Sequence, residues 1–479
     1  MDHSFKLLID GTLREGSTTS PVINPATEQT ITLYPVASKA QLDEAVAAAK
    51  RSQPQWARLP SDERSQALVK IAETIEKNIE RLAHILTLEQ GKPLADAHRE
   101  VNGLAGAFRY FATLDIPVEV REDSPTRRVE IHHRPLGVVA AITPWNFPLA
   151  LIGNKLPPAL LAGNAVVLKP APTTPLSTLL LGELIADILP AGVVNVIADR
   201  NDLGDAMTSH PDVQKITFTG SISTGRKVMA SAAQGLKRLT LELGGNDPAI
   251  VMDNVDPKFV AEKIFAAGFI NSGQVCCAVK RVYVHEKVYD AFVAELRSLA
   301  ATAKVGDGAA TDVRFGPVQN KAQFSKLQTY LNAARTDGEV VAGGEVMAGP
   351  GYFITPAVVT GLSNGHVLVD EEQFGPLLPI VRYADIEEAI SAANALQFGL
   401  GASVWSADEA KAYEIATRLD AGTVWVNQHL DLAPSIPLPA AKQSGVGVAK
   451  GIEGLLAFTQ MTVLNFRKAD GVNSAGARR

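Results

Sequence analysis

Residues 136–142 read LGVVAAI, and this run of β-branched and small apolar residues decides how the middle of the chain folds. Three similar runs follow it: AVVLK (165–169), GVVNVIA (192–198) and VQKITFTG (213–220). The stretches between them, such as TPLSTLLLGELIADILP (174–190), have the composition of helices. Short strands that alternate with helices indicate βαβ units and a parallel sheet. This part of the chain is therefore predicted to be an α/β domain.

The same alternation returns further along the chain. The strand-like runs there are RLTLELGG (238–245), PAIVMD (248–253), KRVYVHE (280–286) and GTVWVN (422–427). Helical patterns are expected near residues 257–270 and over 288–305. We predict a second α/β domain from this pattern.

Residues 61–92 precede both regions and have an amphipathic helical pattern. Ser61 is expected to be the N-cap, with acidic residues in the first turn. Apolar residues then recur three or four positions apart, at Leu68, Ile71, Ile75, Ile79, Leu82 and Leu86. This spacing predicts one long helix or two in succession.

Residues 117–135 alternate apolar with charged residues, as an exposed antiparallel hairpin does, and TVLNFR (462–467) is expected to pair with it. Paired exposed strands favour association with another subunit, so a homodimer or homotetramer is expected. We assign the adjacent His132 and His133 to the hairpin and not to a metal site, because neighbours in a strand point to opposite faces. Residues 469–479 are expected to be a frayed tail.

The composition narrows the classes of function. The 479 residues are 46% hydrophobic, which is enough for a large core, and 45 basic against 51 acidic residues give a net charge of -6. A net negative charge gives no overall positive electrostatic field that would attract nucleic acid. The N-terminus lacks a secretory apolar segment and no apolar stretch of about 18 residues could span a bilayer. A cytoplasmic protein without nucleic-acid or membrane partners is expected.

Both cysteines of the chain stand side by side in FINSGQVCCAVKR (269–281), as Cys276 and Cys277. Adjacent cysteines cannot join distant segments, and no partner motif for zinc accompanies them. The pair is either buried apolar filling or chemistry. A reactive cysteine needs a lowered pKa or a nearby base, some exposure, and donors for the oxyanion that forms when it attacks a carbonyl. Gly273 allows a close backbone approach just before the pair.

Other motifs supply groups of the kind that a reactive cysteine needs. TLELGGNDP (240–248) places Glu242 at the end of a β-rich run, where a carboxyl group in an apolar setting can act as a general base. ITPWNFP (142–148) places the amide of Asn146 after a strand. FTGSISTGRK (218–227) places Ser221 at a helix N-terminus that suits a phosphate. Each of these signals is weak alone, because each also fits an ordinary turn or loop.

The order of the motifs carries more information than any one of them. ITPWNFP, VLKPAPTTP, FTGSxxxG, LELGG, GQVC, EEQFGP and GTVWVN resemble the aldehyde dehydrogenase superfamily from end to end. The match includes INPATEQT (23–30) and the hairpin. It implies a fold with a Rossmann-like NAD(P)-binding domain of residues 1–116 and 136–244, an α/β catalytic domain of residues 245–443, and a small β oligomerisation element of residues 117–135 and 456–468.

The resemblance assigns the catalytic roles. Cys276 matches the nucleophile, Glu242 the general base, and Asn146 the side chain that forms an oxyanion hole with the backbone N–H of Cys276. It implies that the thiolate adds to an aldehyde, that hydride passes to the nicotinamide, and that water activated by Glu242 hydrolyses the thioester to a carboxylic acid. Lys155 matches a proton-relay lysine, but Ala449 stands where some members have the relay acid.

The resemblance also assigns a dinucleotide site. The residues that match it are Ile142, Trp145, Lys169, Gly220, Ser221, Leu243, Glu372 and Phe374. NAD-preferring members often have a glutamate three residues after the motif lysine, and here that residue is Pro172. NAD is the expected cofactor, and NADP is an alternative because no carboxylate at this position would oppose its 2'-phosphate.

The tunnel positions of the superfamily fall on Phe147, Leu151, Asn154, Val275, Cys277, Leu432 and Leu438. Most are apolar, and QHLDLAPSIPL (428–438) offers no Arg or Lys for a substrate carboxylate. We expect an apolar, medium-chain aliphatic aldehyde as the substrate. The alternative is that these leucines belong to the core.

Two other functions compete with this hypothesis. The chain could be a CoA-acylating dehydrogenase, but relatives of that type generally lack the base that Glu242 matches. It could also be a catalytically idle structural or binding member, but such a chain is expected to lose the nucleophile. The retention of Cys276, Glu242 and Asn146 favours a hydrolytic, NAD(P)-dependent aldehyde dehydrogenase with no metal.

Overall fold

The run LGVVAAI and its relatives become neighbouring strands of one sheet in the computed structural model, which describes residues 3–468. Their spatial order is β2-β1-β9-β8-β7-β10-β11-β22. The strands from β9 to β11 are parallel, whereas β1, β2 and β22 are antiparallel to their neighbours. The strands of this sheet are β1 (Leu7–Ile9), β2 (Thr12–Arg14), β7 (Val138–Ile142), β8 (Ala165–Lys169), β9 (Val194–Val196), β10 (Val213–Thr219), β11 (Arg238–Glu242) and β22 (Gly445–Val446).

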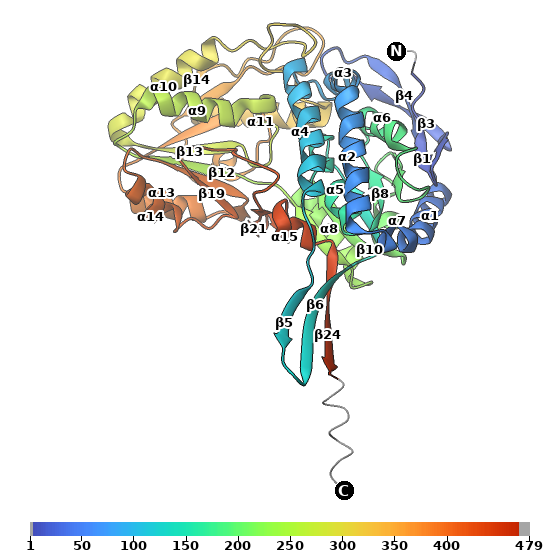
Figure 1. The fold of residues 1–479 in the computed structure, drawn as a ribbon. Helices are drawn as coiled ribbons and strands as arrows, with labels where there is room; N and C mark the ends of the chain where they lie inside the picture. Colours follow the sequence, from blue (N-terminus) through green and yellow to red (C-terminus); the bar gives the residue numbers. More distant parts are fainter. Residues whose placement is uncertain (1–2, 469–479) are drawn as a thin grey trace.

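The second alternating region forms a second sheet with the order β14-β15-β16-β13-β12-β18-β19. All neighbouring strands in it are parallel except β14, which is antiparallel to β15. Its strands are β12 (Asp247–Val251), β13 (Val279–His285), β14 (Glu339–Ala342), β15 (Ala357–Thr360), β16 (Leu377–Tyr383), β18 (Gly401–Trp405) and β19 (Thr423–Val426). Figure 1 shows the two sheets and their helices as two lobes that lie side by side.

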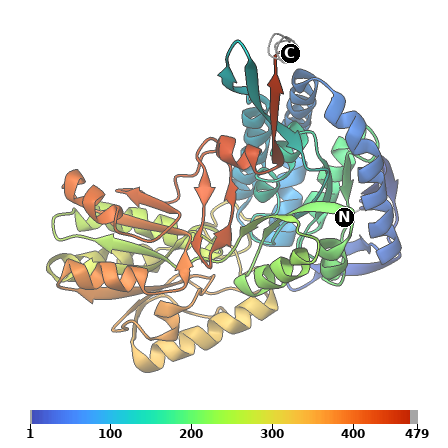
Figure 2. The same cartoon turned by 90° about the horizontal axis from the view of Figure 1, so that it is seen from below.

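A three-stranded arm extends away from both lobes (Figures 1 and 2). It contains β5 (Glu119–Asp123), β6 (Arg127–Pro135) and β24 (Thr459–Arg467), all antiparallel. The predicted hairpin and its pairing with TVLNFR are therefore confirmed. The frayed tail expected at residues 469–479 lies outside the described residues.

Short strand pairs complete the β-structure. They are β3 (Thr18–Ile23) with β4 (Thr30–Val36), β17 (Phe398–Gly399) with β21 (Ala441–Lys442), and β20 (Leu438–Pro439) with β23 (Val448–Ala449). Because residues 441–442 pair with residues 398–399, the segment after residue 437 lies beside an earlier part of the chain.

Most helices after β7 lie between successive strands, as the alternation predicts, whereas the first four helices follow one another between β4 and β5. They are α1 (Lys39–Arg58), α2 (Ser61–Lys77), α3 (Ile79–Gln90), α4 (Leu94–Ala112), α5 (Leu156–Leu161), α6 (Leu176–Ile185), α7 (Gly204–Ser209), α8 (Ile222–Ala233), α9 (Pro257–Phe269), α10 (Glu286–Ala301), α11 (Lys321–Asp337), α12 (Val367–Asp370), α13 (Ile386–Asn394), α14 (Glu409–Ala416) and α15 (Gly451–Leu456). Two 3-10 helices, η1 (Ala150–Ile152) and η2 (Ile270–Gly273), follow the ITPWNFP segment and precede the cysteine pair in the chain. Among residues 3–468, no helix combines the length and the apolar character that crossing a bilayer requires.

The pattern predicted over residues 61–92 forms two helices in succession, α2 and α3, with Asn78 between them. The predicted N-cap at Ser61 is wrong by one residue. Pro60 is the N-cap, and its fixed φ of -52° with an extended ψ of 151° already turns the chain into α2. Ser61 is therefore the first helical residue.

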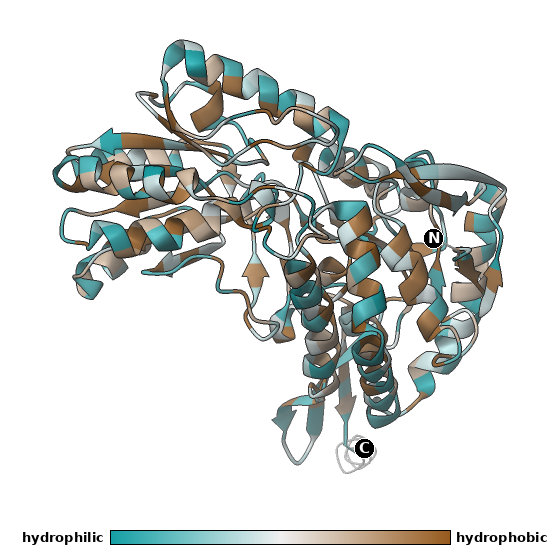
Figure 3. Cartoon of the chain, turned by 90° about the horizontal axis from the view of Figure 1, so that it is seen from above, coloured by the Kyte–Doolittle hydropathy of each residue, from teal (hydrophilic) through white to brown (hydrophobic). Residues whose placement is uncertain are grey.

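Strand alternation distributes the apolar side chains of the second sheet over two cores. Ala249 and Val251 pack into the core that contains residues of α9 and α10, whereas Ile250 between them packs into the core that contains residues of α13 and α14. This is the two-residue period of a strand covered on both faces. In Figure 3 many of the helices carry both hydrophobic and hydrophilic positions, as helices that cover a sheet with one face do. The residue limits of the three predicted parts of the chain stay a prediction.

Candidate active site

Four neighbouring parallel strands of the first sheet, β8, β7, β10 and β11, end at the same edge. Ligands in open α/β sheets bind outside the carboxyl ends of such strands. The predicted residues Lys169, Ile142 and Glu242 are the last residues of their strands, and Ser221 follows β10 by two residues. Motifs that are far apart in the sequence therefore meet at one edge.

A cavity of about 710 Å³, part of it open to solvent, lies beside this edge. Its lining residues are Pro144, Trp145, Asn146, Thr219, Gly220, Ser221, Leu243, Gly244, Cys276, Gln323, Lys326, Glu372 and Phe374. The cavity thus brings together the predicted nucleophile, the predicted oxyanion donor and most of the predicted dinucleotide residues. Of the predicted catalytic and dinucleotide residues, four do not line it: Ile142, Lys155, Lys169 and Glu242; nor do the predicted tunnel residues.

The loop that carries the cysteines has a strained backbone. Asn271, Ser272 and Gly273 all have left-handed φ values, of 51°, 56° and 72°. A Cβ atom at Gly273 would lie 2.2 Å from the carbonyl oxygen of Gly375, so only glycine allows this approach. The close approach expected at Gly273 is confirmed, and it fixes the cysteine loop against the EEQFGP segment.

The two thiols differ in exposure and in acidity. Both are free, but Cys276 is partly exposed at the cavity, whereas Cys277 is buried. A hydrogen bond from the Cys277 thiol and the charge of Lys280 lower the pKa of Cys276 against the opposing effect of burial. The same hydrogen bond and burial raise the pKa of Cys277. Cys276 is therefore the thiol with the more accessible thiolate.

Asn146 connects the cavity to the cysteine loop. Its side chain is 4% exposed, and its Nδ2 donates to the carbonyl oxygen of Gln274 at 3.0 Å. An amide nitrogen carries two hydrogens, so one remains for a group in the cavity. This arrangement suits a donor to an oxyanion formed at Cys276.

Glu242 and Lys155 are two buried titratable groups that affect each other's pKa, and neither lines the cavity. Burial raises the pKa of Glu242, whose Oε1 has no hydrogen-bond partner among the described residues. Burial also lowers the pKa of Lys155, and its Nζ donates to Thr219 Oγ1 at 2.8 Å and Thr217 Oγ1 at 3.3 Å. A carboxyl group with a raised pKa and a free oxygen is suited to general base catalysis near neutral pH.

Lys450, which the sequence reasoning missed, stands beside the position of the absent relay acid. It follows Ala449 and has a left-handed φ of 62°. Burial raises the pKa of Glu242, and the charge of Lys155 and, more weakly, that of Lys450 oppose this rise; burial lowers the pKa of Lys450 itself. The only sequence signal was its position next to Ala449.

Helix α8 offers a binding position for a phosphate at the cavity. It begins with ISTG after the N-cap Ser221, so no carboxylate in its first turn opposes an anion. Ser221 Oγ accepts from the Thr224 backbone N–H at 3.2 Å and is exposed. The helix N-terminus and the neighbouring cavity therefore fit a dinucleotide pyrophosphate.

The EEQFGP segment forms the far wall of the cavity. Glu372 Oε1 accepts from the Gly245 backbone N–H at 3.0 Å. The rings of Trp145 and Phe374 pack edge to face, with their centres 5.3 Å apart. Two residues of α11 that the sequence reasoning missed hold this wall. Gln323 Nε2 donates to the Phe374 carbonyl oxygen at 3.0 Å, and Lys326 Nζ donates to that of Glu372 at 3.0 Å.

Lys169 is engaged by a carboxylate that the sequence reasoning also missed. Its Nζ lies 2.5 Å from Asp199 Oδ1, and both side chains are almost fully buried. Asp199 Oδ2 accepts from the Leu203 backbone N–H at 2.9 Å, which fixes the carboxylate in place. A carboxylate from the segment after β9 therefore lies at Lys169, although position 172 has none.

Four of the predicted tunnel residues gather around Cys276. Val275, Cys277, Phe147 and Leu432 belong to one small apolar cluster with Trp425, Leu400 and Ala440. The structure does not place Leu151, Asn154 or Leu438 in this cluster. Trp425 and Leu430 are members that the sequence reasoning missed, and GTVWVN was the available signal for the first.

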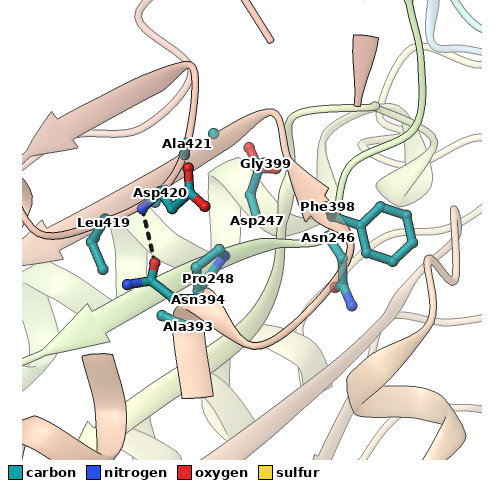
Figure 4. A pocket seen from close by; sticks show the side chains of 12 residues that line it. Asn246, Asp247, Pro248, Ala393, Asn394, Phe398, Gly399, Leu419, Asp420 and Ala421 are labelled. Carbon is teal, nitrogen blue, oxygen red and sulfur yellow. Dashed lines mark hydrogen bonds between the residues drawn. The ribbon is translucent and has the colours of Figure 1, made fainter. Parts of the chain in front are cut away.

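A second hollow, of about 240 Å³, is lined by Asn246, Asp247, Asp420 and neighbouring residues (Figure 4). Asn394 Oδ1 accepts there from the Asp420 backbone N–H at 2.8 Å. Burial raises the pKa of Asp247 to about 8. This hollow contains no thiol, so we place the candidate site at the larger cavity.

His132 and His133 lie in β6, as predicted, and are partly buried. His132 Nε2 is 2.8 Å from Glu130 Oε2, and His133 Nδ1 is 2.9 Å from Thr459 Oγ1. Among residues 3–468, no group of three or more His, Cys, Asp or Glu residues gathers around a common point as metal ligands would.

Comparison with known proteins identifies the family. The model of the aldehyde dehydrogenase family matches residues 13–464. Phenylacetaldehyde dehydrogenase of Pseudomonas fluorescens is 39% identical over 459 residues, which are 91% of this chain and 90% of that protein. The structure of a mutant aldehyde dehydrogenase from Bacillus cereus superimposes with a TM-score of 0.95 at 33% identity and covers 97% of each chain.

A third relative was solved with its cofactor. Betaine aldehyde dehydrogenase from Staphylococcus aureus in complex with NAD+ gives a TM-score of 0.93 at 32% identity, over 97% of this chain and 95% of that one. The two sheets, the arm and the cavity lined by Cys276 define an α/β protein with a thiol at the carboxyl ends of its strands. The chain belongs to the aldehyde dehydrogenase family. The predicted fold and the predicted NAD(P)-dependent enzyme class are confirmed at this level.

Proposed function

We propose that the protein oxidises an aldehyde to the carboxylic acid with NAD+ through a thioester on Cys276. The observation that carries this proposal is the convergence of three groups at one place. A partly exposed thiol with a lowered pKa and a buried amide donor line one cavity, and a carboxyl group with a raised pKa lies behind it. Such groups suit nucleophilic attack, oxyanion stabilisation and general base catalysis.

Each group has one task in this proposal. The Cys276 thiolate forms a bond to the aldehyde carbon, and Asn146 Nδ2 with the Cys276 backbone N–H stabilises the oxygen that becomes negative. The bound dinucleotide supplies the acceptor for the hydride that leaves this carbon. Glu242 then takes a proton from water, and the resulting hydroxide breaks the carbon–sulfur bond to release the acid and the thiolate. Burial lowers the pKa of Lys155 and of Lys450, so the neutral amine of either side chain can receive the proton from Glu242.

Glu242 supports hydrolysis over acyl transfer to CoA. A thioester destined for CoA needs no base for water, whereas a buried carboxyl group with a raised pKa is costly to keep without such a use. Release of free acid without CoA is the expected outcome. The idle-protein alternative predicts a thiol that reacts with iodoacetamide but supports no turnover of any aldehyde.

The substrate side of the site favours an apolar aldehyde. Cys276 belongs to a cluster with Phe147, Val275, Leu432 and Trp425. A substrate carboxylate in such surroundings would lose its hydration without gaining a partner. The phenylacetaldehyde dehydrogenase relative is named for an apolar aldehyde, and the betaine aldehyde dehydrogenase is named for a cationic one. We propose a medium-chain aliphatic aldehyde.

We expect kcat/KM for unbranched aldehydes to rise by about fourfold per added methylene until the tunnel is filled, because each buried CH₂ contributes about 0.8 kcal/mol. Initial rates of cofactor reduction with aldehydes of increasing length provide the measurement. A six-carbon aldehyde and its analogue with a terminal carboxylate form a matched pair, and the uncharged one should be at least about tenfold better. Faster turnover of the charged analogue would refute the apolar tunnel.

We expect Asp199 to give the enzyme a preference for NAD over NADP. If Lys169 lies at the adenosine ribose, the Asp199 carboxylate opposes a 2'-phosphate and neutralises the lysine that could bind it. Asp199→Asn should tighten NADPH binding relative to NADH by about tenfold, which corresponds to about 1.4 kcal/mol. Fluorescence titration of both reduced cofactors measures this ratio, with the exposed Asp205→Asn as control. An unchanged ratio in a folded Asp199→Asn protein would show that Asp199 does not set the preference.

The arm supports the predicted homodimer or homotetramer. Val120, Met461, Val463 and Phe466 on its strands are exposed large apolar residues, and Met461 is 60% exposed. Val120 and Phe466 lie on one face of this sheet and Met461 and Val463 on the other, and exposed apolar residues on a sheet are typical of an association surface. The oligomeric state and the cytoplasmic location stay predictions.

A further inference from the structure

A buried ion pair outside the proposed catalytic groups contacts the segment that carries Asn146. Lys92 lies just before α4, and Glu100 is in α4. Their side chains are 0% and 1% exposed, and Lys92 Nζ donates to Glu100 Oε2. The role of this pair is not explained by any step of the proposed reaction.

Both members of the pair bind the backbone of residues 146–150. Lys92 Nζ donates to the Asn146 carbonyl oxygen at 2.9 Å. Glu100 Oε1 accepts from the backbone N–H groups of Leu149 at 2.9 Å and Ala150 at 3.1 Å. The pair therefore holds the segment at both ends, through one carbonyl and two amides.

The contacts continue from this segment to the cysteine loop. Asn271 Nδ2 also donates to the Asn146 carbonyl oxygen, at 3.1 Å, and Asn146 Nδ2 donates to the Gln274 carbonyl oxygen at 3.0 Å. Lys92 Nζ also lies 3.8 Å from the centre of the Phe147 ring. A movement of the pair would therefore shift the amide of Asn146 relative to Cys276.

Stability alone gives a weak reason for a buried ion pair at this place. Removing two charges from water costs several kcal/mol, and apolar residues of similar volume are often equally stable. Charge-assisted hydrogen bonds are, however, short and directional. They fix a backbone segment more precisely than apolar packing does, and catalysis is sensitive to displacements of about 1 Å.

We propose that Lys92 and Glu100 are positioning residues that hold the Asn146 amide where the oxyanion forms at Cys276. This inference rests on the proposed function and goes beyond it by naming the groups that align the oxyanion donor. Two reactions of Cys276 should therefore respond differently to the loss of the pair. Attack on a carbonyl needs the aligned amide, whereas alkylation of the thiolate by iodoacetamide forms no oxyanion and does not need it.

The double variant Lys92→Met/Glu100→Gln tests this proposal because it removes both charges and leaves neither one unpaired. Glu89→Gln is the matched control. Glu89 is also a fully buried carboxylate that accepts from two backbone N–H groups, those of Leu176 and Ser177, but it does not contact residues 146–150. Asn146→Ala removes the amide donor completely and so measures how far the rate of ester hydrolysis falls without it. Two rates are measured without dinucleotide: hydrolysis of p-nitrophenyl acetate and alkylation of Cys276 by iodoacetamide.

In the double variant we expect kcat for ester hydrolysis to fall by about 10- to 100-fold with KM nearly unchanged, because loss of one oxyanion donor costs about 10²- to 10³-fold. Alkylation should stay within about twofold of the wild-type rate, since it develops no oxyanion. Glu89→Gln should keep both rates. The single variant Glu100→Gln retains an acceptor for Leu149 and Ala150 but leaves Lys92 without its counter-ion, so it should be less stable and, as folded protein, show a smaller loss of the same kind.

Other outcomes decide against the proposal in distinct ways. Wild-type ester hydrolysis in a folded double variant or in Glu100→Gln would overturn it. Equal losses of hydrolysis and alkylation, or an equal loss in Glu89→Gln, would show a general structural effect and would overturn it as well. A wild-type protein that neither hydrolyses the ester nor oxidises any aldehyde would instead contradict the proposed function.

Discussion

Replacing Cys276 with serine should reduce aldehyde oxidation by roughly 10⁴-fold or more, as loss of a catalytic nucleophile does in well-studied hydrolases. A serine hydroxyl has a far higher pKa than the Cys276 thiol, whose pKa the neighbouring thiol and Lys280 lower further. Without a base at the hydroxyl, almost no alkoxide exists at neutral pH. Steady-state reduction of NAD+ with a medium-chain aldehyde provides the measurement.

Cys277→Ser is the control for this result. Cys277 is buried, and its pKa is raised, so its thiol is a poor nucleophile. A serine at position 277 keeps a donor for Cys276, and we expect activity within about tenfold of the wild type, the range of a modest packing change. If Cys277→Ser lost nearly all activity while Cys276→Ser kept it, the assignment of Cys276 as the nucleophile would be wrong.

Replacing Glu242 with glutamine should slow turnover by roughly 10²- to 10⁴-fold, the usual contribution of a general base. The base must be ionised to take a proton from water, and burial raises its pKa. Wild-type turnover should therefore increase as the pH rises through this raised pKa and level off above it. Glutamine cannot titrate, so the variant should lose this increase.

The measurement is the pH dependence of kcat for both proteins. A wild-type profile that rises only in the ordinary range of an exposed carboxylate would show that the Glu242 pKa is not raised in the working enzyme. The same rise in Glu242→Gln would assign the titration to another group, such as Lys155 or Cys276. Only the loss of the rise in the variant agrees with the proposed base.

The local pattern of the sequence was sufficient for most of the fold. LGVVAAI and the runs after it alternate with helical stretches, and each became a parallel strand with its crossover helix. The pairing of the arm was predictable for a similar reason, because β6 and the C-terminal strand both alternate in polarity. The N-cap of α2 was misplaced because a proline at position 60 was not considered as a cap.

The site was predictable where the residues lie in motifs at strand ends. Asn146, Ser221 and Cys276 line the same cavity because β7, β10 and the cysteine loop end there. Gln323, Lys326, Asp199 and Lys450 could not be found in this way. Asp199 and Gln323 act through contacts between segments 30 to 51 residues apart, namely Lys169–Asp199 and Gln323–Phe374. Lys450 acts through its charge near Glu242. No short motif encodes such contacts.

The intact mass of Glu242→Gln after mixing with aldehyde and NAD+ tests the covalent intermediate most directly. Blocked hydrolysis should leave the acyl group on the protein, so the mass should increase by that group, and peptide mapping should place it on Cys276. No such adduct should form in Cys276→Ser. An active wild-type enzyme whose Glu242→Gln variant reduces cofactor but carries no acyl group, or carries it on another residue, would contradict the account.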